Sequence, residues 1–139
     1  MEKISRNQEN FIIMTVIYDE LNDYVAGQNN FRDVNEIILE ITEIPFKEHS
    51  VYVQNSIASV LSHYGEIVSA FQPHLRNWVW ERLPLLTRAV LLMSYAHFYY
   101  VEKIDKRIVI NVAVELAKKY IEEKQAKFIN AILDEVLNG

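Results

Sequence analysis

The segment 85–100 carries apolar residues on nearly every face of a helix. A helix that is apolar all round has no side suited to water, so other elements must surround it. Pro84 stands directly before the segment, where proline fits the first turn of a helix. We therefore predict a buried central helix over 85–100, which the rest of the chain has to cover.

The rest of the chain also repeats its apolar residues at the spacing of a helical face. The predicted stripes are Phe11, Met14, Tyr18, Leu21 and Val25, widened by Ile13, Val16, Ile17 and Tyr24; Val34, Ile37, Ile38 and Ile41; Val53, Ile57, Val60, Leu61 and Tyr64; Ile67, Val68 and Phe71; Val109, Ala113, Leu116, Ala117 and Tyr120; and Phe128, Ile129, Ile132, Leu133, Val136 and Leu137. With the central helix, these stripes predict an all-α bundle of about seven helices.

Local signals mark where these helices begin and end. Ser5 and Gln8 have the spacing of a capping box, and Asp105 is a good N-cap for the helix that follows it. Further boundaries are expected at the turn 26–30, at Pro45, at Gly65 and at Pro73, followed by a connector over 76–83 with Trp78 and Trp80.

Composition excludes several classes of protein. The 139 residues favour one domain, and three glycines with three prolines are too few for the turns of a β-sandwich or barrel. The absence of cysteine excludes disulfides and thiolate metal sites. The N-terminus lacks the apolar core of a signal peptide, and the apolar runs are too short to span a membrane. We expect a soluble cytoplasmic protein with no membrane contact.

No pattern in the chain points to catalysis, a metal or a cofactor. The glycines at 27, 65 and 139 cannot form a phosphate-binding loop. No glutamate has a histidine three residues on, which a di-iron helical bundle requires. None of the four histidines pairs with another at metal-ligand spacing, and His97 is expected to be partly buried and hydrogen-bonded. We predict a protein that is not an enzyme.

The charge is unevenly distributed along the chain. The net charge is −5, but residues 1–75 hold four basic and eleven acidic residues, whereas residues 76–139 hold ten basic and eight acidic ones. An anionic partner would therefore meet the C-terminal half. Its basic cluster comprises Lys118, Lys119, Lys124 and Lys127, for which a solvated surface is the alternative interpretation.

Three motifs in the C-terminal half are found together in one known family. They are Arg82-Leu83-Pro84-Leu85 with Arg88-Ala89-Val90-Leu91, Val109-Ile110-Asn111-x-Ala113-Val114-Glu115-Leu116-Ala117-Lys118, and Lys127-Phe128-Ile129-Asn130-Ala131-Ile132-Leu133-Asp134. Their order and spacing resemble the NusB family of transcription antitermination factors. Ile17-Tyr18 matches the family's Leu-Tyr pair, which aligns Ser5-Arg6 with the start of its arginine-rich motif.

The resemblance implies a single domain over 1–139 with two packed helical subdomains, 1–72 and 73–139. It implies binding to boxA-type RNA jointly with a small-subunit ribosomal protein, in antitermination and ribosomal RNA synthesis. Family members occur as monomers and dimers, so a homodimer stays open. On this basis we predict RNA-binding residues Ser5, Arg6, Lys124, Lys127 and Phe128, and partner-binding residues His97, Tyr99 and Tyr100.

The chain departs from the family at polar positions. Asn7 and Asn10 stand where the family has further arginines, and each lost cation removes a phosphate contact. Val112 replaces the family's glutamate, Ala96-His97-Phe98 its Tyr-Glu-Leu, and Glu123-Lys124-Gln125 its Glu-Asp-Ser.

Two main interpretations follow from these departures. The chain is either an RNA-binding antitermination factor with an altered surface or a protein-interaction module that kept the fold and lost RNA binding. A third, weaker interpretation is a domain that assists an enzyme in trans, since a NusB-like fold also occurs fused ahead of RNA methyltransferase domains.

Overall fold

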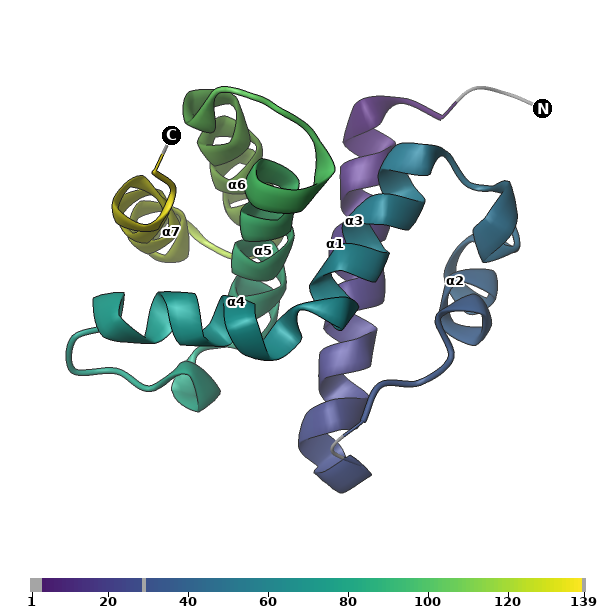
Figure 1. Ribbon diagram of the computed structural model, residues 1–139, viewed down its shortest axis with the longest axis horizontal. Helices are drawn as coiled ribbons and strands as arrows, with labels where there is room; N and C mark the ends of the chain where they lie inside the picture. The colour runs from purple at the N-terminus through teal and green to yellow at the C-terminus, as the bar shows by residue number, and fades with distance from the viewer. Residues whose placement is uncertain (1–3, 29, 139) are drawn as a thin grey trace.

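The computed structural model describes residues 4–28 and 30–138, and all the regular structure in these two ranges is helical (Figure 1). The seven α-helices are α1 (Arg6–Asp23), α2 (Val34–Thr42), α3 (Val51–Ser62), α4 (Tyr64–Phe71), α5 (Leu85–Ala96), α6 (Lys106–Tyr120) and α7 (Glu123–Val136). Short π turns cover Tyr24–Gln28 and His97–Val101, and 3-10 turns cover Phe46–Glu48, Gln72–His74 and Trp80–Arg82. The predicted all-α fold of about seven helices is confirmed.

Helix α5 is the centre of the molecule. It packs against α1, α3, α4, α6 and α7, and most of its residues are buried. It ends at Ala96, earlier than predicted, and the chain continues as the π turn His97–Val101. Tyr99 and Tyr100 lie on this turn with 40% and 38% of their surface exposed. The last apolar residues of the segment are therefore partly surface rather than core.

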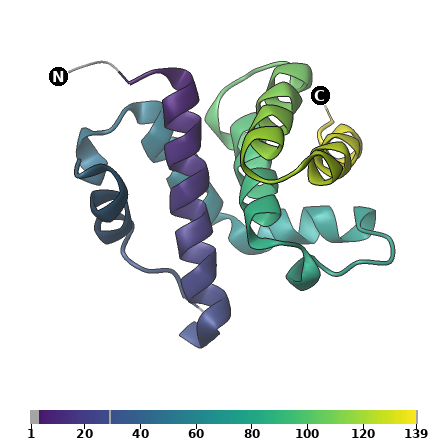
Figure 2. The same cartoon turned by 180° about the vertical axis from the view of Figure 1, so that it is seen from behind.

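The remaining helices lie on two sides of α5. Seen from the front and from behind, α5 stands between α1 on one side and α7 on the other (Figures 1 and 2). Helices α2 and α3 pack on α1, and α6 pairs with α7. Helix α4 packs on α3, α5 and α7, so it contacts elements from both predicted subdomains. The division between residues 72 and 73 stays a prediction.

Local signals placed most helix ends correctly. Ser5 and Gln8 form both hydrogen bonds of a capping box, Asp105 caps α6 through the backbone N–H of Arg107, and α5 begins directly after Pro84. The predicted turn at 26–30 contains Gly27, whose φ of 107° is costly for any residue with a Cβ. Residue 29 of that turn and the N-terminal residues 1–3 lie outside the described residues.

The break between α3 and α4 is at His63 rather than at the predicted Gly65. His63 has φ −113° and ψ 18°, outside the helical range, so Tyr64 begins the next helix. Gly65 lies within α4, where it does not need a left-handed conformation.

Two residues of the first predicted stripe are not in the core. Phe11 is 37% exposed and Val25 51% exposed, whereas the flanking Ile13, Val16 and Ile17 are fully buried. The neighbouring helices cover the face of α1 that these flanking residues form, and Phe11 instead contacts the ring of Tyr120 in α6, with centroids 5.0 Å apart.

Within the described residues, no helix is both long and apolar enough to cross a membrane. Nor do three or more histidine, aspartate or glutamate side chains gather there as metal ligands.

Candidate nucleic-acid interface

The predicted residue Ser5 serves as the N-cap of α1. Its hydroxyl accepts the backbone N–H of Gln8 at 3.1 Å, and its own N–H donates to Oε1 of Gln8 at 2.9 Å. The pair satisfies backbone donors that have no partner within the helix. Ser5 is exposed, but its hydroxyl oxygen already accepts a hydrogen bond.

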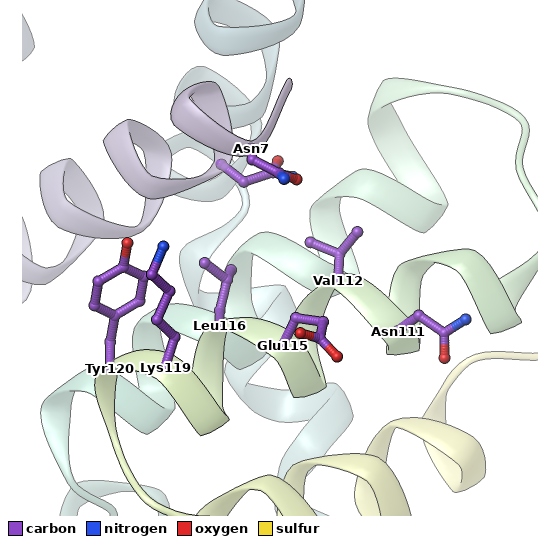
Figure 3. A pocket seen from close by; sticks show the side chains of 8 residues that line it. Asn7, Asn111, Val112, Glu115, Leu116, Lys119 and Tyr120 are labelled. Carbon is purple, nitrogen blue, oxygen red and sulfur yellow. The ribbon is translucent and has the colours of Figure 1, made fainter. Parts of the chain in front are cut away.

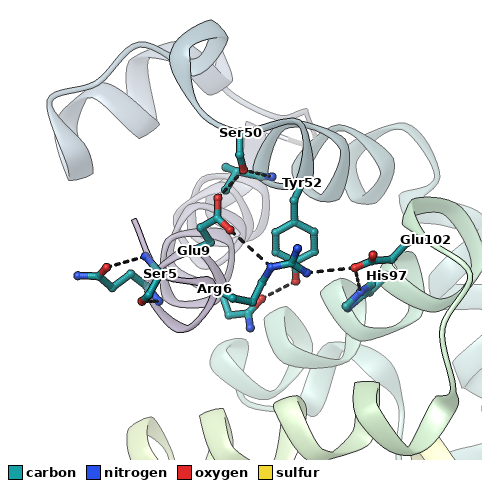
Figure 4. A network of polar contacts seen from close by, with 10 residues as sticks. Ser5, Arg6, Glu9, Ser50, Tyr52, His97 and Glu102 are labelled. Carbon is teal, nitrogen blue, oxygen red and sulfur yellow. Dashed lines mark hydrogen bonds and ion pairs between the residues drawn. The ribbon is translucent and has the colours of Figure 1, made fainter. Parts of the chain in front are cut away.

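Arg6 opens α1 and folds back onto the protein (Figure 4). Its Nη1 donates to Oε1 of Glu102 at 3.1 Å, and its Nε lies 3.5 Å from Oε1 of Glu9. The guanidinium carbon stands 3.7 Å from the ring centroid of Tyr52, a cation–π contact. The side chain is 53% exposed, so it is tied to the protein on one side and open to solvent on the other.

The same network joins three parts of the chain. Glu102 Oε1 also lies 2.7 Å from Nε2 of His97, and the hydroxyl of Tyr52 donates to Oδ1 of the buried Asn10. The start of α1, the start of α3 and the segment after α5 are therefore linked by polar contacts (Figure 4). Arg6 stands at their junction.

The charges in this network stabilise one another. The pKa of Glu102 lies below its ordinary value, mainly because its carboxylate is hydrogen-bonded to His97. Burial acts in the opposite direction, but the contact with Arg6 also lowers the pKa. Burial acts to lower the pKa of Arg6, but the hydrogen bond to Glu102 and the attraction of the Glu102 and Glu9 carboxylates outweigh it and raise that pKa. Burial raises the pKa of Tyr52 to about 12, so it stays a neutral hydrogen-bond donor.

The other predicted RNA-binding residues lie at the start of α7. Lys124 and Lys127 are exposed on its first two turns, and Phe128 is half-buried against the core. Helix α7 packs on α6, α5 and α4 rather than on α1. The five predicted residues thus form two groups, and the end of α6 lies between them, since Tyr120 contacts Phe11 of α1 and α7 starts at Glu123.

A groove between α1 and α6 was not foreseen from the sequence (Figure 3). It consists of a hollow of about 310 Å³ and a second of about 410 Å³, and Asn7, Lys119 and Tyr120 line both. The second hollow also reaches the end of α2, where Ile41, Thr42 and Ile44 line it. Asn111 and Glu115 line the first hollow. A signal was present, because residues 111, 115 and 119 recur every four positions and so share one helix face. The opposing Asn7 could not be placed without the fold.

The predicted partner-binding residues differ in exposure. His97 is only 6% exposed and packs beside Tyr52, so it offers a partner little surface. Tyr99 donates its hydroxyl to the carbonyl of Val136 at 3.1 Å, and Tyr100 stacks on His63 with centroids 4.1 Å apart. Both tyrosines are held in place while remaining exposed. The candidate partner surface therefore consists of Tyr99 and Tyr100, without His97.

The described residues form an all-helical scaffold that carries cationic and aromatic side chains at the starts of α1 and α7, groups suited to binding another molecule. The chain belongs to the NusB family, whose model matches residues 12–138, and this is a family of non-enzymatic transcription antitermination proteins.

Named relatives agree with this assignment. The chain is 29% identical over 108 residues to the transcription antitermination protein NusB of Oceanobacillus iheyensis, covering 76% of this chain and 86% of that one. It is 31% identical over 103 residues to the protein of the same name from Listeria welshimeri, covering 73% and 80%.

Solved structures share the fold. NusB of T. maritima superposes with a TM-score of 0.81 at 21% identity, over 98% of this chain and 92% of that one. A chain from a crystal structure of the antitermination factors NusB and NusE in complex with dsRNA superposes with a TM-score of 0.74 at 23% identity, over 95% of each chain.

Proposed function

We propose that this antitermination protein binds boxA-type RNA of ribosomal RNA operons jointly with a small-subunit ribosomal protein. The observation that carries the proposal is the start of α7, where the family's Lys-Phe pair stands as an exposed Lys127 beside a half-buried Phe128. A second exposed cation, Lys124, lies one turn earlier. The similar fold solved with NusE and dsRNA supports a role in which RNA and a second protein are bound together.

Six of the predicted residues have roles that follow from their chemistry. Arg6, Lys124 and Lys127 contact phosphates, and such contacts lose affinity as salt rises. Phe128 offers the exposed part of its ring to an unpaired base. Tyr99 and Tyr100 provide the aromatic surface for the ribosomal protein, since tyrosines held in place make good interface anchors.

Titration of labelled boxA-type RNA at several salt concentrations tests the assigned site. Arg6→Ala and Lys127→Ala are expected to weaken binding and to reduce the salt dependence by about one phosphate contact each. Arg76→Ala is the matched control, because Arg76 is an exposed arginine on the connector after α4. If wild type binds and neither variant differs from the control, the assigned site is wrong.

A second candidate function is a protein-interaction module that has lost RNA binding. The net charge of −5 and the asparagines at positions 7 and 10 favour it. It predicts no measurable RNA binding with or without the ribosomal protein, and co-purification of specific RNA would count against it.

A further inference from the structure

We propose that the α1–α6 groove binds one unpaired nucleotide of the RNA, with Asn7 and Asn111 hydrogen-bonding to the base and Lys119 contacting the phosphate. The proposal rests on the proposed function, because it names a subsite for the same RNA. It adds a site made of side chains from the two halves of the chain.

The groove is large enough for a single base. Asn7 extends from α1 toward α6, and Val112, Leu116 and Lys119 point toward it from the opposite side (Figure 3). The smaller hollow, of about 310 Å³, is at the lower end of the range for small-molecule sites. The larger hollow adjoins it at Lys119 and Tyr120, and the rest of its lining is mostly apolar, so the phosphate is placed at the edge that Lys119 forms.

The lining has the chemistry that distinguishes a base from a bare phosphate. Each asparagine amide offers both a donor and an acceptor, as base edges require, and Glu115 can accept a hydrogen bond from an exocyclic amino group. Val112 and Leu116 supply an apolar surface for the face of the base.

Among the residues at the start of α1, Asn7 is the one that lines both hollows of the groove. Arg6 is directed toward Glu102 and Tyr52, away from the groove, and Asn10 is 3% exposed with its amide oxygen bound to Tyr52. An amide here, in place of the family's arginine, exchanges a phosphate contact for a contact that can read a base edge.

The test titrates the isotope-labelled full chain with each of the four ribonucleoside monophosphates and follows its NMR spectrum. We expect saturable shifts in the side-chain amide signals of Asn7 and Asn111, larger for one base than for the others. Ribose phosphate, which lacks the base, is expected to shift signals near Lys119 alone. The proposal is overturned if no signal shifts, if the shifts lie outside the groove, or if ribose phosphate acts like the nucleotides.

Matched variants show whether Asn7 itself makes the contact. Asn7→Ala is expected to raise the Kd for the preferred nucleotide about two- to tenfold, the effect of one lost hydrogen bond. Asn22→Ala is the control, because Asn22 is an exposed residue of the same helix outside the groove. Equal effects of the two variants would overturn the proposal, whereas a weaker affinity in Asn7→Ala alone supports it.

The nucleotide titration needs neither boxA-type RNA nor the ribosomal protein, so it separates the two proposals. If boxA-type RNA binds but nucleotides do not shift the signals of the groove, the groove proposal is wrong and the proposed function stands. If nucleotides bind in the groove but boxA-type RNA does not bind, the proposed function is wrong and the groove still binds nucleotides.

Discussion

Arg6 donates to the carboxylate of Glu102 at 3.1 Å, although 96 positions separate the two residues in the chain. The predicted phosphate contact is therefore already paired with an anion of the protein itself. An RNA phosphate that binds Arg6 must compete with Glu102, which His97 holds in place from the other side.

Removing this competitor should strengthen RNA binding. Glu102→Gln is expected to lower the Kd for boxA-type RNA about two- to fivefold, because exposed ion pairs of this kind contribute about 0.2–1 kcal/mol. The gain should vanish in the Arg6→Gln background. Glu81→Gln is the control, since it makes the same charge change at an exposed site on the turn Trp80–Arg82. Equal gains in both glutamine variants would mean that only net charge matters.

Two variants separate the role of Ser5 as a helix cap from its predicted role in RNA binding. Ser5→Ala removes the cap of α1 and should lower the free energy of unfolding by about 1 kcal/mol, measured by urea denaturation. Ser5→Asp keeps a capping oxygen but adds a negative charge, so it should retain stability and weaken RNA binding. An aspartate variant that binds RNA as wild type does would place Ser5 away from the phosphates.

Glu20 should make stability depend on pH. It is fully buried; its Oε1 accepts the backbone N–H of Arg32 at 2.7 Å, and its Oε2 has no hydrogen-bond partner among the described residues. Burial raises its pKa from 4.5 to about 7, so the folded protein holds this proton more tightly than the unfolded chain does. The resulting stabilisation is complete below the unfolded pKa and is lost as pH rises through the folded pKa.

The matched variant for this effect is Glu20→Gln, which keeps the acceptor for Arg32 and does not titrate. Between about pH 5 and about pH 8, wild type should lose on the order of 3 kcal/mol relative to the variant, measured by urea denaturation at both values. A stability difference that stays constant with pH would show that Glu20 does not titrate in this window.

The two tryptophans of the connector should differ sharply when truncated. Trp80 is 1% exposed and stacks on Phe71, whereas Trp78 is 55% exposed. Trp80→Ala should cost about 3–5 kcal/mol of unfolding free energy, and Trp78→Ala less than about 0.5 kcal/mol. Similar losses at both positions would contradict the packing described for this connector.

The fold was predictable because its determinants are local. The buried central helix, the capping box at Ser5 and the N-cap at Asp105 depend on neighbouring residues, and the structure confirms each of them, although the central helix ends at Ala96 rather than at residue 100. The exposure of Phe11 and Val25 was not predictable, since it depends on which face of α1 the other helices cover.

Much of the candidate site depends on contacts between distant residues. The pairing of Arg6 with Glu102 and the groove that Asn7 lines together with Asn111 and Lys119 arise only when α1 packs beside the C-terminal helices. The sequence identified Arg6 and the α7 lysines as cations but could not show that Arg6 is already paired. The expectation that His97 is partly buried and hydrogen-bonded is confirmed, but its partner Glu102 could not be named from the sequence.

The most direct test of the proposed function is a fluorescence-anisotropy titration of wild-type protein with labelled boxA-type RNA, at low and moderate salt, with and without the small-subunit ribosomal protein. We predict binding that weakens as salt rises and tightens when the ribosomal protein is present. Absence of binding under all four conditions would contradict the proposed function and favour the protein-interaction module.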